Sequence, residues 1–234
     1  MNGGSIPVHM SLGKTLNSSI GAKALMAVTG IILVLFVIGH MLGNMLVYVG
    51  QDALNDYAAK LKSLGPLLWV IRLVLLATLV AHVAAARHVV KVSKAARPVA
   101  YQRRKDQATS FAARTMWVSG IVTFLFIAYH LLHLTLGVID PAGVAGVLDG
   151  QGRVDVYGMV VAGFQDWTIT AVYVVAIVVL CLHISHGASS VLQTLGLRRA
   201  GNASGFDKVG PALAVVILIG NLSIPLSILA GLVG

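Results

Sequence analysis

The sequence is poor in charge, has one cysteine and contains no glutamate. Only 11% of its 234 residues are charged, against about 25% in an average soluble domain. The single cysteine, Cys181, excludes an intrachain disulfide framework and a Cys-x-x-Cys-His motif for covalent haem attachment. None of the eight acidic residues lies centrally in an apolar stretch, so the helix-borne carboxylates of a di-iron or hydrolytic metal centre are missing as well. These absences argue against a soluble domain, a disulfide-rich secreted domain and a carboxylate-based metal site.

Long apolar stretches fill most of the chain instead. Hydrophobic residues make up 57% of the sequence, and the mean hydropathy is +0.88. A helix that crosses a bilayer needs about 20 apolar residues, and five stretches reach that length: about 24–49, 66–92, 113–138, 167–195 and 209–233. The sequence therefore predicts an all-α protein with five transmembrane helices, forming one membrane domain over residues 1–234 in a lipid bilayer.

The connections between these stretches differ in composition. Residues 140–165 are rich in glycine and aspartate, and we expect them to form an outside loop that is long enough to carry local structure. Pro211 is expected to mark the last inside turn, where the fifth stretch begins. The sequence shows no repeat of a fixed period.

Lysine and arginine concentrate in alternate connections. They precede the first apolar stretch, flank or fill the connection between the second and third, and lie between the fourth and fifth: Lys14, Lys23; Arg87, Lys91, Lys94, Arg97, Arg103, Arg104, Lys105, Arg114; Arg198, Arg199, Lys208. By the positive-inside rule, the N-terminus lies inside and the C-terminus outside. We therefore expect a multi-pass protein of the cytoplasmic membrane whose basic inner face docks a protein partner or anionic lipid. We expect no nucleic-acid partner.

Five of the eight histidines lie deep within the apolar stretches: His40, His82, His130, His183 and His186. An unsatisfied polar group in the bilayer costs several kcal/mol, so each is either hydrogen-bonded to a neighbouring helix or functional. At about 1.5 Å per residue, His40 and His130 fall roughly 5–7 Å to the outer side of the midplane, and His82 and His186 roughly 5–8 Å to the inner side. Two pairs at depths about 12 Å apart match the axial ligands of two non-covalent b haems stacked in a four-helix bundle made by the first four helices.

Two further arrangements of histidine allow other interpretations. The spacing of three in His130/His133 and in His183/His186 would let two imidazoles share a metal ion on one helix face, but such sites also need carboxylates. We therefore expect His133 and His183 to support the ligands or the packing. Arg87 and His88, at the inner end of the second stretch, are expected either to neutralise haem propionates or to form an ordinary basic edge.

Four segments resemble the cytochrome b558 family, the five-helix dihaem membrane subunit of succinate dehydrogenases and fumarate reductases. They are SSIGAKALMAVTGIILVLFVIGHMLGN (18–44), ALNDYAAKLKSLGPLLWVIRLVLLATLVAHV (53–83), RTMWVSGIVTFLFIAYHLLHLTLG (114–137) and LHISHGASSVLQTLGL (182–197). The pattern H-G-x-x-S-x-x-Q-T-L-G in the last segment is the most specific.

This resemblance implies the haem ligands. His40 pairs with His130 at the outer, distal haem, and His82 pairs with His186 at the inner, proximal haem. The family pattern selects His186 over His183 because it directly precedes a glycine, and it selects the histidine ten residues after a Ser-Gly in the third helix.

The resemblance also implies the partners and the reaction. A flavoprotein subunit and an iron–sulfur subunit would dock on the cytoplasmic face, and electrons would pass between them and a membrane quinone, for which we expect menaquinone. No catalytic residue for succinate chemistry is then expected in this chain. Some dihaem fumarate reductases carry a membrane glutamate near the fourth-helix ligand, and its absence here mildly favours succinate oxidation.

A quinone needs hydrogen-bond donors near a haem edge and close to the membrane surface. Candidates at the outer end are His133, Asn44, Asn55 and Tyr57, and candidates at the inner end are Ser18, Ser19 and Lys23; we favour the outer set. Two other functions stay open from the sequence: a cytochrome b subunit of a hydrogenase or formate dehydrogenase, and a proton-coupled transporter with intramembrane histidines.

Overall fold

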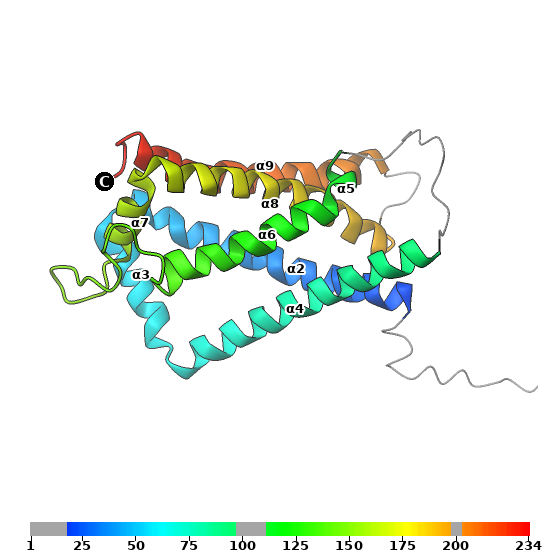
Figure 1. Cartoon of the computed structure of the whole chain (residues 1–234), viewed down its shortest axis with the longest axis horizontal. Coiled ribbons are helices and arrows are strands. Elements are labelled where there is room, and N and C mark those ends of the chain that lie inside the picture. Colours follow the sequence, from blue (N-terminus) through cyan, green and yellow to red (C-terminus); the bar gives the residue numbers. More distant parts are fainter. Residues whose placement is uncertain (1–17, 97–110, 198–202) are drawn as a thin grey trace, which may run out of the picture.

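The computed structural model describes residues 18–96, 111–197 and 203–234, which form helices and their connections (Figure 1). The long helices are α2 (Ser19–Asn44), α4 (Pro66–Ala95), α6 (Met116–His130), α8 (Trp167–Thr194) and α9 (Ala203–Leu229). The short elements are η1 (Met45–Tyr48), α3 (Gln51–Ser63), α5 (Phe111–Arg114), the π-helical turn η2 (Leu131–Thr135) and α7 (Val156–Gln165). With η1 and η2 counted as continuations, five helices in the described part of the chain are long and apolar enough to cross a membrane. The prediction of a multi-pass helical membrane protein is confirmed.

Local sequence sets where the spanning helices begin. The Ser18 side chain accepts a hydrogen bond from the backbone N–H of Gly21 at 3.0 Å at the start of α2. Asp166 likewise accepts from the N–H of Thr168 at 2.7 Å at the start of α8. These caps satisfy N–H groups that have no partner in the first helical turn. Pro66 occupies the first turn of α4, since its fixed φ suits that position and it has no N–H to leave unpaired.

Two short helices lie in the connections. α3 separates the first two spanning helices, and α7 occupies the second part of the expected loop 140–165, whose first part contains an isolated bridge between Leu148 and Val154. The expectation for Pro211 is wrong, because α9 begins at Ala203 and includes this proline. Helical backbone is favoured here despite the proline, since a spanning segment must satisfy its peptide groups internally.

The four helices that carry the deep histidines associate in pairs. α2 packs along α4, α6 packs along α8, and the two pairs meet where α2 contacts α8 (Figure 1). The diagonal pairs α2/α6 and α4/α8 are not among the packed helix pairs. The two helices of each diagonal pair are therefore in contact through side chains and not through closely packed backbones.

α9 lies against α8 and also contacts α2. A Cβ atom at Gly210 would overlap the Ser185 carbonyl and the Ser189 hydroxyl of α8, and one at Gly220 would overlap the Met41 sulfur of α2. Small residues allow membrane helices to approach this closely. The contact fixes the position of α8, which carries two of the deep histidines.

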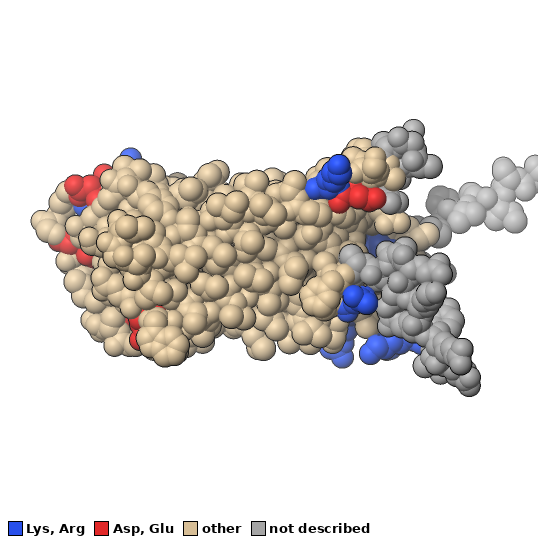
Figure 2. Space-filling model, turned by 90° about the horizontal axis from the view of Figure 1, so that it is seen from above, with Lys and Arg blue, Asp and Glu red and all other residues tan. Residues whose placement is uncertain are grey.

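Charged side chains gather at the two ends of the molecule (Figure 2). Most of the described lysines and arginines, among them Lys23, Lys91, Lys94 and Lys208, lie where α2 and α9 begin and α4 ends. Most aspartates lie at the opposite end, around α3 and the connection to α7. Seven basic residues of the predicted inner face lie outside the described residues: Lys14, Arg97, Arg103, Arg104, Lys105, Arg198 and Arg199.

A hydrogen-bonded cluster closes the aspartate-rich end. The fully buried Asn55 amide donates to Asp149 at 2.9 Å and to Asp155 at 3.0 Å, and its oxygen accepts from the N–H of Tyr157 at 3.0 Å. Burial alone would raise the pKa of Asp149, but hydrogen bonds from Arg153 and Asn55 hold this pKa well below its usual range. Arg153 forms ion pairs of 2.6 to 2.7 Å with Asp52, Asp56 and Asp149. These contacts tie the loop after η2 to α3.

Candidate functional site

Two histidines on α2 and α6 face each other. The ring centres of His40 and His130 lie 5.6 Å apart, with the ring planes at 86°. Each imidazole also lies against the phenylalanine four residues earlier on its own helix, at 5.5 Å for Phe36 and 6.0 Å for Phe126. The structure thus places the two rings of the predicted outer pair side by side.

The inner level differs from the family pattern. The ring centre of His82 on α4 lies 6.4 Å from that of His183 on α8, with the planes at 67°. His186, which the resemblance selects, has its Nε2 atom 3.1 Å from the Ser190 hydroxyl of its own helix. Residues three apart on a helix point roughly 60° away from each other, so both cannot face α4 equally. The geometry favours His183 as the partner of His82.

A hydroxyl group from a neighbouring helix contacts each inner histidine. Thr29 Oγ1 on α2 lies 3.0 Å from His82 Nδ1. Ser119 Oγ on α6 lies 3.2 Å from His183 Nδ1. Both contacts join a side-chain hydroxyl to an imidazole Nδ1 atom at a similar distance, one between α2 and α4 and the other between α6 and α8.

These matching contacts identify an internal repeat. VTGIILVLFVIGH (28–40) aligns with VSGIVTFLFIAYH (118–130) at an offset of 90 residues, and His82 aligns with His183 at an offset of 101. The two offsets differ, so the repeat has no single fixed period and was not predicted from the sequence. The halves α2–α4 and α6–α8 present equivalent histidines to each other, so each pair combines one residue from each half.

The repeat also includes a glycine next to each of the histidines His82 and His183. A Cβ atom at Gly30 would lie 3.4 Å from His82 Cε1, and one at Gly120 would lie 3.4 Å from His183 Cε1. The absence of a side chain at both positions lets the imidazole edges rest against the helix backbone.

The hydroxyl–histidine contacts also give the distance, along the helix axes, between the two histidine pairs. Thr29, which touches His82, lies eleven residues before His40, and Ser119 lies eleven residues before His130. At about 1.5 Å per residue, the levels are roughly 16 Å apart along the helices, somewhat more than the value of about 12 Å expected from depth alone.

The donor set fits two bis-imidazole haem sites. Metal–imidazole bonds of about 2 Å place the centres of two opposing rings about 6 Å apart, close to the observed 5.6 and 6.4 Å. In both pairs the rings come from diagonal helices that are not closely packed. A flat macrocycle between two axial ligands requires such an arrangement.

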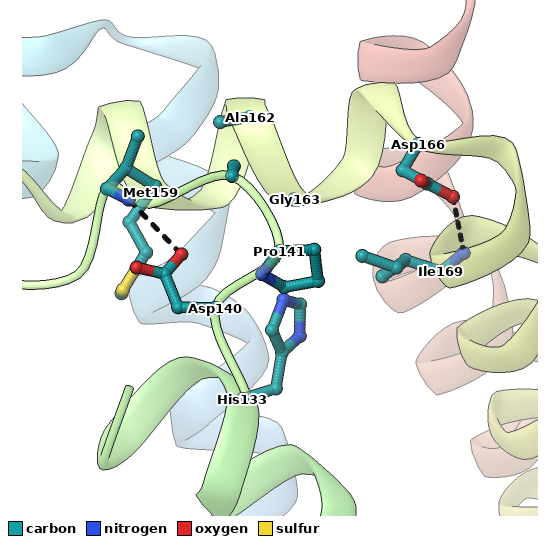
Figure 3. Close-up of a pocket in the computed structure, with 10 residues that line it drawn as sticks. His133, Asp140, Pro141, Met159, Ala162, Gly163, Asp166 and Ile169 are labelled. Carbon is teal, nitrogen blue, oxygen red and sulfur yellow. Dashed lines mark hydrogen bonds between the residues drawn. The ribbon is translucent and has the colours of Figure 1, made fainter. Parts of the chain in front are cut away.

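A third histidine lies beside the outer pair and lines a cavity (Figure 3). The π-helical turn carries His133, which is only 5% exposed, and such turns often occur at functional sites. Its Nδ1 atom lies 2.9 Å from the Tyr173 hydroxyl, which is also 3.4 Å from His130 Nδ1. The cavity of about 220 Å³ is further lined by Asp140, Pro141, Ala142, Val144, Met159, Ala162, Gly163, Asp166 and Ile169.

Asp140 brings negative charge to this cavity. Its two carboxylate oxygens accept hydrogen bonds from the N–H of Ala145 at 2.7 Å and of Val144 at 3.2 Å. The bond from Ala145 is the largest influence on the Asp140 carboxyl and lowers its pKa. The cavity wall therefore combines an imidazole with an ionised carboxylate.

The other residues predicted near quinone or haem lie elsewhere, and of the seven quinone candidates only His133 lines the cavity. Asn55 belongs to the hydrogen-bonded cluster at the aspartate-rich end, where both its N–H groups and its oxygen have partners. The Tyr57 ring packs on Gly43, and Asn44 ends α2. At the opposite end, Ser18 caps α2, Ser19 and Lys23 lie in its first turns, and Arg87 and His88 lie in the last turns of α4.

Sequence reasoning missed four residues of this region: Thr29, Ser119, Tyr173 and Asp140. The first two had a recognisable signal, because each precedes a glycine and lies eleven residues before a deep histidine. No sequence signal pointed to Tyr173, because its contact with His133 depends on how α8 faces α6.

No protein-family model matches this chain, and no curated protein and no solved structure matches it. The resemblance to the cytochrome b558 family stays a prediction, and the geometry of the histidines carries the functional argument.

Proposed function

We propose that this chain is the membrane-anchor, dihaem cytochrome b subunit of a succinate:quinone oxidoreductase. In this proposal α2, α4, α6 and α8 form a four-helix bundle that holds two non-covalent b haems. The observation that carries the proposal is the facing of histidine rings across diagonal helices at two levels, with separations of 5.6 and 6.4 Å. When bound, haem iron supplies reversible one-electron transfer.

The proposed ligands follow the facing rings. His40 and His130 hold the outer haem, and His82 holds the inner haem together with His183. We prefer His183 to His186 because its ring lies opposite His82 and its Nδ1 atom is engaged by Ser119. The Nε2 atom of His186 is instead engaged by a serine of its own helix.

The proposed topology places the lysine-rich end inside the cell, with the N-terminus inside and the C-terminus outside. This agrees with the positive-inside rule and with the gathering of described lysines at one end. The flavoprotein and iron–sulfur subunits would dock on this cytoplasmic face, nearest the His82/His183 level. Arg87 and His88 lie at the same end of α4, where they would compensate haem propionates.

The cavity at His133 is the proposed quinone site. If His130 binds iron through Nε2, its Nδ1–H donates to the Tyr173 oxygen, and the Tyr173 O–H donates to His133 Nδ1. That order leaves the His133 Nε2–H as a donor for a quinone carbonyl. The distance of 2.9 Å between the Tyr173 oxygen and His133 Nδ1 permits this order of donors, and menaquinone is the expected quinone.

Haem quantitation of the purified protein tests the proposal. The wild-type chain should contain about two b haems, because two imidazole pairs are available. The change His183→Ala should lower the content to about one, since it removes an axial ligand of the inner iron. The change His186→Ala, three residues away on the same helix, is the matched control and should leave two.

Other outcomes separate the alternatives. Loss of a haem in His186→Ala with retention in His183→Ala would restore the ligand choice of the family pattern. A folded wild-type protein without haem would contradict the proposed function and favour the histidine-based transporter. Copurification of a hydrogenase or formate dehydrogenase in place of the succinate-oxidising subunits would assign the cytochrome to a different enzyme.

A further inference from the structure

The hydroxyl groups of Thr29 and Ser119 each donate their single proton to a backbone carbonyl of their own helix. Thr29 Oγ1 lies 2.7 Å from the Leu25 carbonyl oxygen and 3.2 Å from that of Met26. A carbonyl oxygen can only accept, so the single hydroxyl proton of Thr29 points along its own helix. Toward His82 Nδ1 the hydroxyl offers a lone pair.

The same constraint holds in the second half of the chain. Ser119 Oγ lies 3.1 Å from the Met116 carbonyl oxygen, which again takes up the hydroxyl proton. The contact with His183 Nδ1 at 3.2 Å is then a bond that the imidazole donates.

The donor assignment decides which nitrogen can bind a metal. A neutral imidazole carries one N–H, and a histidine that donates through Nδ1 keeps the lone pair on Nε2. Metal-bound histidines almost always donate their other N–H to a fixed acceptor, which sets the tautomer and ring orientation and raises ligand basicity. His82 and His183 both meet this condition in the structure.

We propose that Thr29 and Ser119 are positioning residues that hold His82 and His183 as the two axial ligands of the inner haem, each by accepting the Nδ1 proton. The inference rests on the proposed function, because it concerns the ligands of that haem. It also explains why the repeat keeps a hydroxyl residue followed by glycine in both halves. The hydroxyl determines that Nδ1 of the imidazole carries the proton. The glycine lets the imidazole ring approach the helix closely enough for this hydrogen bond.

Redox titration of the full chain with its haems tests this inference. The changes Thr29→Val and Ser119→Ala remove the acceptor and nearly preserve shape. Each should raise the midpoint potential of one haem, because a less basic imidazole stabilises the ferric iron less. Each should also weaken retention of that haem by about 10- to 100-fold, while the potential of the other haem stays unchanged.

Three variants control for packing. Thr29→Ser and Ser119→Thr keep the hydroxyl and should retain the wild-type potential. Ser223→Ala removes a hydroxyl with the same bond to the carbonyl three residues earlier, at 2.9 Å, on α9, a helix that carries no histidine; it should change neither potential. If Ser119→Ala does not accumulate, Ser119→Cys, which accepts hydrogen bonds only weakly, should give a shift of the same sign.

The possible results distinguish a failure of this inference from a failure of the proposed function. A wild-type protein with two b haems whose potentials do not respond to Thr29→Val or to Ser119→Ala would overturn this inference and leave the proposed function intact. A shift of equal size in Ser223→Ala would also overturn it, because the effect would then reflect packing alone. A wild-type protein without b haem would overturn both.

Discussion

The packing of α9 on α8 predicts that two glycine-to-alanine changes in one helix have opposite effects. At Gly210 the added Cβ would overlap the Ser185 carbonyl and the Ser189 hydroxyl, whereas at Gly205 it would meet nothing within 4 Å. Alanine favours a helix over glycine by up to about 1 kcal/mol. Overpacking typically costs about 1–3 kcal/mol, and here a backbone carbonyl must move to relieve it.

The magnitudes follow from these two terms. Because a backbone carbonyl must move at Gly210, the upper part of the overpacking range, about 2–3 kcal/mol, applies there. Gly205→Ala should stabilise the protein by up to about 1 kcal/mol. Gly210→Ala should destabilise it by about 1–2 kcal/mol once the gain in helix propensity of about 1 kcal/mol is subtracted. A protein of this length shifts its melting temperature by about 2–4 °C per kcal/mol. The two variants should therefore melt about 4–12 °C apart.

The assay is thermal unfolding in one detergent, followed by helical circular dichroism. Wild type should melt between the two variants. If Gly210→Ala melts at or above wild type, the close backbone contact between α8 and α9 is refuted, together with the argument that this contact fixes the histidines of α8.

Two further predictions concern the ends of the molecule. Because the folded pKa of Asp149 is lowered, its stabilising effect is complete above its ordinary pKa of about 3.9 and is lost as the pH falls through the folded value. The difference in melting temperature between wild type and Asp149→Asn should be constant from pH 5 to 7 and shrink below about pH 4; a difference that grows on acidification would refute the role of the ionised form. For topology, a cysteine at the exposed Ala142 should react with an impermeant reagent in intact cells, and one at the exposed Lys94 should not. The reverse pattern would move the partner-docking face to the outside.

The number and approximate limits of the spanning helices could be predicted from the sequence. In lipid every peptide group must find its partner within the helix, so the length of an apolar stretch is nearly sufficient to define the element. The capping role of Asp166 and the helical state around Pro211 were not predicted, because helix ends depend on single contacts. α3 and α7 were missed for a related reason, since short helices outside the apolar stretches lack that constraint.

The sequence by itself determined the five apolar helices, the asymmetry of basic residues and the positions of His40, His82 and His130 along their helices. These properties depend on composition and on the constant helical rise. Only the tertiary structure decided which ring faces His82, because His183 and His186 differ in depth by one turn or less and are separated by rotation about the axis of α8. It also decided that Thr29 and Ser119 contact histidines of a neighbouring helix, and that Asn55 is used within the hydrogen-bonded cluster at the aspartate-rich end. Rotation and contact between helices arise from the packing of all the side chains together, and no single stretch of sequence specifies them.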